Sequence, residues 1–183
     1  MTRSMGTTIA LFAAGLLAIG CGDDGESAPA ADAQRPVDAA PPVDALQCND
    51  LVLAGPEVAE IYVAEDVPVP QGGAAIPDGT YHLIETRTYT GTSGATGPSG
   101  NVFKATIRVT DLVMDAIEQN NIGWEVPMSS TSELVIDGAY LNHHYTCPDW
   151  GDVRGGFDTE PGKLILYGTY QDLPWDAVYE LQP

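Results

Sequence analysis

Short segments rich in Tyr, Thr, Val and Ile recur along residues 48-183, separated by Gly and Pro. In FKATIRV, residues 103-109, the odd-numbered positions are apolar and the even-numbered positions are polar or charged. This alternation is typical of an antiparallel strand with one face on a core. Segments of similar composition are EIYVAE (60-65), GTYHLIETRTYTG (79-91), SSTSELVID (129-137), AYLNHHYTC (139-147), KLILYGTY (163-170) and DAVYELQ (176-182). Their spacing predicts an all-β fold, an antiparallel up-and-down barrel or barrel-like meander of about eight strands.

Two local patterns refine this prediction. Asp137-Gly138 is a strong hairpin signal, and we expect it to join the strand ending near Ile136 to the strand that contains the two adjacent histidines. Residues 111-121, DLVMDAIEQNN, fit either a helix that begins after Asp111 or a further strand. Because strands are expected on both sides, the strand is favoured.

Residues 1-20 have the pattern of an export signal, with a positive charge at Arg3 before an apolar run over 9-19. The run is shorter than the roughly 20 apolar residues of a membrane-spanning helix. The sequence LLAIGC that ends at Cys21 resembles the lipobox of bacterial lipoproteins. The resemblance implies that Cys21 carries acyl chains such as palmitate, and Gly22 implies the outer membrane of a Gram-negative bacterium. An ordinary signal peptide without lipid is the alternative.

Residues 21-47 begin with Cys21 and otherwise contain little besides Asp, Ala, Pro, Gly and Ser. The sequence PVDA occurs there twice, at 36-39 and 42-45. Such a composition buries too little apolar surface to offset chain entropy, so we expect a disordered tether before a domain of residues 48-183. The whole chain carries a net charge of −19, with only seven Lys and Arg. This charge argues against a nucleic-acid partner and permits cationic ones.

Three cysteines are an odd number for an exported protein, and the odd one is accounted for if Cys21 carries lipid. Cys48 and Cys147 then remain as a pair in an oxidising compartment, where a disulfide is expected. A bonded Cys147 supplies neither a nucleophile nor a metal ligand.

The order of the later segments, from IPDGTYHLIETRTYTG (76-91) through a Cys-Pro strand to KLILYGTY and AVYELQ, resembles small lipocalin-like (calycin) domains. The resemblance covers most of residues 76-183. It implies an antiparallel barrel with an internal cavity, and no particular ligand. Most of the Trp, Tyr and Phe residues, which include Trp124, Trp150 and Trp175, are expected in the core or at the barrel ends, and a minority of the set are candidates to line a pocket for an apolar or sugar ligand.

The densest cluster of potential ligands is LNHHYTCPDW, residues 141-150. On a strand the adjacent His143 and His144 point to opposite faces, so they are not expected to share a metal ion. The next candidates, for calcium, are acids expected in a solvated loop over residues 148-162: Asp149, Asp152, Asp158 and Glu160. Their spacing does not match an EF-hand, so an ordinary solvated loop without a calcium ion is the preferred interpretation.

No catalytic motif or cofactor-binding pattern is found in the sequence, so an enzyme is not predicted. Two classes of function stay open. The first is a membrane-anchored lipoprotein whose domain binds a small ligand. The second is an envelope interaction or structural protein that contacts another protein or a polysaccharide through its outer surface.

Overall fold

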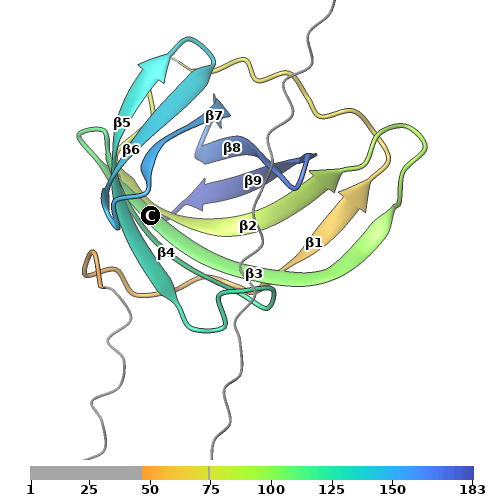
Figure 1. Cartoon of the computed structure of the whole chain (residues 1–183). Coiled ribbons are helices and arrows are strands. Elements are labelled where there is room, and N and C mark those ends of the chain that lie inside the picture. The colour runs from red at the N-terminus through yellow and green to blue at the C-terminus, as the bar shows by residue number, and fades with distance from the viewer. Residues whose placement is uncertain (1–46, 74) are drawn as a thin grey trace, which may run out of the picture. The chain divides into compact units, whose positions relative to one another are not determined.

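The computed structural model describes residues 47–73 and 75–183, which form a single β-sheet that closes into a ring (Figure 1). The predicted signal peptide, the lipidated Cys21 and the tether up to residue 46 lie outside the described residues. The strands are β1 (Val58–Val63), β2 (Gly79–Tyr89), β3 (Gly97–Thr110), β4 (Val113–Asn120), β5 (Met128–Asp137), β6 (Tyr140–Cys147), β7 (Gly151–Glu160), β8 (Lys163–Tyr170) and β9 (Leu173–Leu181). Among the described residues, no helix is long and apolar enough to cross a membrane.

The strands β2 to β9 follow one another as an antiparallel meander, and the pairing of β2 with β9 closes the ring. This confirms the prediction of an all-β, up-and-down fold. The ninth strand, β1, lies parallel to β2 and antiparallel to β3 (Figure 1). Ile61 is paired with Arg87 on one side and with Pro98 on the other, so β1 continues the sheet where β2 and β3 separate.

The two local predictions are also confirmed. Residues 113–120 form β4, and the preceding Asp111 and Leu112 have positive φ angles of 49° and 62° in the turn that follows β3. The helical alternative is therefore wrong. Gly138, with a φ of 64°, lies in the tight turn that joins β5 to β6, as Asp-Gly predicted.

The main core lies inside the ring and contains the alternating apolar residues of the strands. Ala105, Ile107 and Val109 are buried there, and Leu164 packs in the same cluster. The odd positions of FKATIRV thus face inward as expected. A second, smaller cluster lies on the opposite face of β8 and β9 and consists of Ile165, Tyr167 and Val178, with Val67 and Ile84 packed against it.

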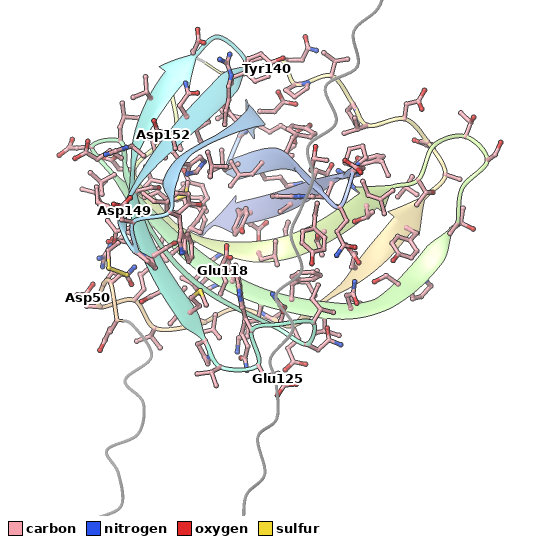
Figure 2. All side chains as sticks on the ribbon, viewed as in Figure 1. Asp50, Glu118, Glu125, Tyr140, Asp149 and Asp152 are labelled. Atoms are coloured by element: carbon pink, nitrogen blue, oxygen red, sulfur yellow. A yellow bond between two sulfur atoms is a disulfide. The ribbon has the colours of Figure 1, made fainter. Side chains whose placement is uncertain are left out.

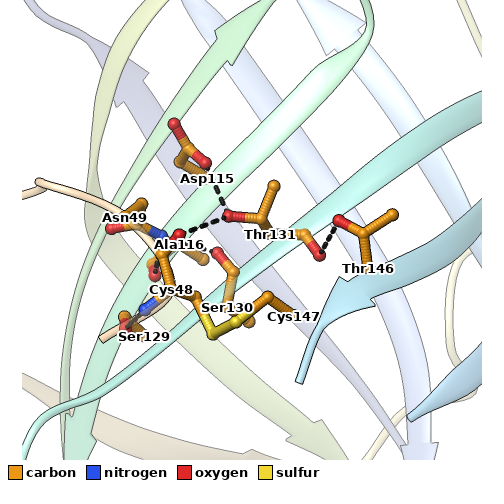
Figure 3. Close-up of a disulfide and its surroundings, with 9 residues drawn as sticks. All are labelled: Cys48, Asn49, Asp115, Ala116, Ser129, Ser130, Thr131, Thr146 and Cys147. Carbon is orange, nitrogen blue, oxygen red and sulfur yellow. Dashed lines mark hydrogen bonds between the residues drawn. A yellow bond between two sulfur atoms is a disulfide. The ribbon is translucent and has the colours of Figure 1, made fainter. Parts of the chain in front are cut away.

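A disulfide joins Cys48, at the start of the described chain, to Cys147 at the end of β6, as the cysteine count predicted (Figure 3). Hydrogen bonds support the attachment: the backbone N–H of Cys48 donates to Oγ of Ser129 at 2.8 Å. The side chain of Asn49 donates to the carbonyls of Ala116 and Ser130 at 3.1 and 2.7 Å. The segment before β1 is therefore fixed across β4, β5 and β6.

Candidate functional site

The ring encloses a cavity of about 700 Å³ whose wall comes from strands β3 to β9. This volume is within the range of about 300–1,000 Å³ for small-molecule sites. Apolar and aromatic side chains make up most of the wall, and Trp124, Trp150 and Trp175 are among them. Trp150 is 46% exposed and Tyr140 is 47% exposed while both line the cavity, so the cavity reaches the surface.

Among the described residues that line this cavity, Glu118 is the one acidic side chain. Along β4, Met114, Ala116 and Glu118 share the inner face, and the first two are buried. Figure 2 shows Glu118 directed into the ring. Its carboxylate accepts no hydrogen bond from any residue in the described part of the chain, and burial raises its pKa. It retains solvent-accessible surface because it faces the cavity and not the protein interior.

An aromatic cluster lines the same cavity as Glu118. The ring of Tyr145 lies 5.1 Å from that of Trp150 between centroids, and Trp150 stacks on Trp124 at 6.4 Å. Burial, with a smaller contribution from the nearby charge of Glu118, raises the pKa of Tyr145 to about 12. The same two causes raise the pKa of Tyr179 on β9. Glu118 therefore shares the cavity wall with Tyr145 from β6 and Tyr179 from β9.

The two adjacent histidines lie on opposite faces of β6, as predicted. His143 lines the cavity, stacks on Tyr145 at 5.9 Å and is 3.2 Å from Oγ of Ser132 through Nδ1. Burial lowers its pKa to about 4, so its imidazole is neutral at pH 7. His144 is exposed on the outside, where its Nδ1 lies 2.6 Å from Oδ1 of Asp152. That hydrogen bond is the largest cause of its raised pKa.

The rim near Tyr140 carries a cation. The guanidinium of Arg154 lies 4.3 Å from the centroid of the Tyr140 ring, and it donates to Asp137 at 3.0 Å. Both partners are largely exposed, so this arrangement contributes little to stability. The charge of Arg154 is thus neutralised at the rim and not by Glu118.

The ring is incompletely paired on one side. Strand β7 pairs with β6 over residues 151–156 but with β8 only over 156–160, so its first half diverges from the end of β8. Val153 and Arg154 line the cavity on one side of this divergence, and Gly168 and Thr169 line it on the other. The cavity therefore extends sideways between the two strands.

Residues 64–73, called the strap here, cover this side from outside. Val67, Pro68 and Pro70 line the cavity. Asp158 holds the strap, because its Oδ1 accepts hydrogen bonds from the backbone N–H groups of Gln71 and Gly72. Its Oδ2 accepts a bond from Oη of Tyr167 at 2.8 Å.

The acids considered for calcium do not converge. Asp149 precedes β7, and Asp152, Asp158 and Glu160 lie on β7 itself, so the expectation of a solvated loop over this segment is wrong. Asp152 pairs with His144, while Asp158 holds the strap. Figure 2 shows Asp149 and Asp152 at the outer side of the ring. Within the described ranges, no group of three or more His, Cys, Asp or Glu side chains is arranged to hold a metal ion.

Glu118 was missed by the reasoning from sequence, although the signal was present. Once residues 113–120 are assigned to a strand, the period-two pattern places Glu118 in line with Met114 and Ala116 on the core face. An acid at an inward position is the departure that marks a functional side chain.

Comparison with protein-family models, with curated proteins and with solved structures finds no match to this chain.

Proposed function

We propose that this protein is a lipid-anchored envelope protein whose ring-shaped domain binds a small amphipathic ligand. The observation that carries the proposal is the cavity of about 700 Å³, open at the surface and lined mostly by apolar and aromatic side chains. A sheet whose interior served only stability would fill this space with side chains, since protein cores pack at crystal-like density.

The polar groups of the wall favour an amphipathic ligand over a purely apolar one. Glu118, His143, Ser130 and Ser132 face the cavity from three adjacent strands, while the opposite wall carries Trp175 and other apolar groups. A few polar groups in an apolar wall are typical of sites that fix one end of a ligand.

Native mass spectrometry of the protein purified from cells that express the full chain tests ligand binding. We expect an additional mass of a few hundred daltons that denaturation removes. The variant Ala116→Trp fills the cavity from β4 and should be purified without it. Val113→Trp, on the outer face of the same strand, is the matched control and should retain it. Wild-type protein that binds neither an endogenous molecule nor an added amphiphile would contradict the proposal.

The lipid anchor rests on the resemblance of LLAIGC to a lipobox and needs a separate test. Cells grown with an alkyne-bearing palmitate analogue should label the wild-type protein, and the labelled protein should sediment with membranes. Cys21→Ser should remove both properties, because Cys21 is the acceptor in the proposal. Equal labelling of the two proteins would exclude Cys21 as the anchor.

A further inference from the structure

The starting observation is that Glu118 has no counter-charge in the described part of the chain. Of the cations there, Arg87 pairs with Asp176, Arg108 pairs with Asp50 and Asp115, and Arg154 pairs with Asp137. Lys104 and Lys163 do not line the cavity. An acid that lies in a mostly apolar cavity without a partner destabilises the fold, so a ligand group is the natural candidate to neutralise it.

We propose that the ligand is an organic cation of the ammonium type, with its charged group beside Glu118 and an apolar remainder in the rest of the cavity. This inference rests on the proposed function of ligand binding. It specifies which chemical class the cavity selects.

The surroundings of Glu118 suit an ammonium group. Tyr145 lines the same cavity as Glu118, and the ring of Trp150 lies 5.1 Å from that of Tyr145 at an angle of 58°. Aromatic faces attract cations through their quadrupole, and a carboxylate beside them adds direct charge pairing. Ile107 and Met114 line the same cavity and provide an apolar wall for the remainder of the ligand.

The charge of the whole domain favours the same class. Residues 48-183 carry about −15 of the total net charge of −19. Such a field raises the local concentration of cations and repels anions. An anionic amphiphile would have to enter the cavity against this field, and its acidic group could lie beside Glu118 only if the two groups shared a proton. Binding of an anionic amphiphile is therefore the alternative that the experiment must exclude.

Three probes with the same ten-carbon chain separate charge from apolar burial: decyltrimethylammonium, decanol and decanoate. Each is titrated into the purified full chain, the two ionic probes below their micelle concentrations and decanol below its solubility limit. Binding is measured by calorimetry and by the fluorescence of Trp124 and Trp150, which line the cavity. We expect the quaternary ammonium to bind at least about tenfold more tightly than decanol, and decanoate to bind most weakly.

Glu118→Gln removes the charge at constant size and should weaken binding of decyltrimethylammonium by about tenfold or more while decanol binding is unchanged. Glu133→Gln is the matched control, because Glu133 lies on the exposed face of the neighbouring strand β5. It should leave the affinity for all three probes unchanged.

The pH dependence of ligand affinity distinguishes direct charge pairing by Glu118 from a merely structural role of this residue. The titratable or charged groups that face the cavity are Glu118, Tyr140, His143, Tyr145, Arg154, Tyr167 and Tyr179. Burial lowers the pKa of His143 and raises the pKa of Tyr145 and Tyr179, so these remain neutral between about pH 5 and 9, while the guanidinium stays charged. Affinity for decyltrimethylammonium, which cannot titrate, should therefore rise with pH as Glu118 ionises, and Glu118→Gln should abolish that rise.

The outcomes separate the two proposals. If decanol or decanoate binds as tightly as the ammonium, or if Glu118→Gln binds the ammonium like wild type, the cation inference is overturned while ligand binding stands. If none of the three probes binds, the proposed function fails as well. The expected order of affinities, with the loss confined to Glu118→Gln, supports both.

Discussion

His143 and His144 show how strongly a single step along a strand changes the chemistry of a side chain. His143 faces the cavity, and burial lowers its pKa to about 4. His144 faces solvent beside Asp152, which raises its pKa. As the pH falls, His144 therefore takes up a proton at a higher pH than an ordinary histidine does, and His143 takes one up at a lower pH.

The first prediction concerns acid stability. Because the folded protein resists protonating His143 until about pH 4, while the unfolded chain takes the proton near pH 6.5, stability should be lost as pH falls between these values. The contribution is up to about 3 kcal/mol. Urea unfolding at a series of pH values should show this loss in wild type and a smaller one in His143→Gln. His144→Gln, on the exposed face, should leave the loss in place, and equal pH profiles for wild type and His143→Gln would refute the assignment.

The second prediction concerns the stability cost of Glu118. Its raised pKa means that the folded state holds a proton at pH values where the unfolded chain has released it. Stability should consequently fall as pH rises above the ordinary value for Glu, and Glu118→Met should be about 1 kcal/mol more stable than wild type at pH 7. Urea unfolding measures the difference, with Glu133→Met on the exposed face as the control. A less stable Glu118→Met protein would show that the carboxylate has a structural partner.

At the scale of elements, the strands with clear period-two alternation were predictable from sequence. FKATIRV lies within β3, with its odd positions in the core, and KLILYGTY is β8, with Leu164 and Ile165 in clusters on opposite faces. The Asp-Gly turn fixed the hairpin of β5 and β6. In each case local propensity, alternation and turn chemistry agree, which is the condition for a successful local prediction.

Strand β7 could not be predicted in this way. Its sequence, GDVRGGFDTE, is rich in Gly and Asp, which are depleted in strands. Tertiary pairing with β6 and β8 overrides that preference. Gly155 is required where β7 and β8 diverge, because a Cβ atom there would lie 2.6 Å from the carbonyl oxygen of Tyr167. The cavity opening and the strap depend on this strand, so they were equally inaccessible from sequence.

The third prediction concerns the strap. Asp158→Ala removes the acceptor of the Gln71 amide and of the Tyr167 hydroxyl, and it leaves the Gly72 amide with only its bond to the carbonyl of Phe157. Hydrogen exchange of residues 67–73 should accelerate by an amount that corresponds to about 1–3 kcal/mol of local stability. Asp152→Ala, an exposed acid on the same strand, is the control and should leave the strap unchanged. Unaltered exchange in Asp158→Ala would mean that other contacts hold the strap.

At the scale of the whole molecule, the Cys48–Cys147 disulfide closes a loop with a sequence separation of 99. For a loop of this length, the chain-entropy model gives a stabilisation of up to about 4.7 kcal/mol. This is a substantial part of the roughly 5–15 kcal/mol that stabilises a typical domain. Most of the ring, from β1 to β6, lies within that loop.

The fourth prediction follows directly. The double variant Cys48→Ser, Cys147→Ser should lose several kcal/mol of unfolding free energy, up to about 4.7, because its unfolded chain is no longer restricted. Urea unfolding of wild type with and without a reducing agent should reproduce the difference. Cys21→Ser should behave like wild type in this assay. Equal stability of reduced and oxidised protein would show that the bond adds little.

The same bond also determines how the molecule would carry a mechanical pull between its two ends. Tension applied before Cys48 and after Cys147 passes directly across the two sulfur atoms, so the strands between them in sequence bear no load. Only β7, β8 and β9 would be drawn out in a pulling experiment on the oxidised protein, and reduction would release the 99-residue segment as additional length. Glu118, Trp124, Tyr145 and about half of the residues that line the cavity lie within the shielded part, so a single covalent link protects that half of the wall from force.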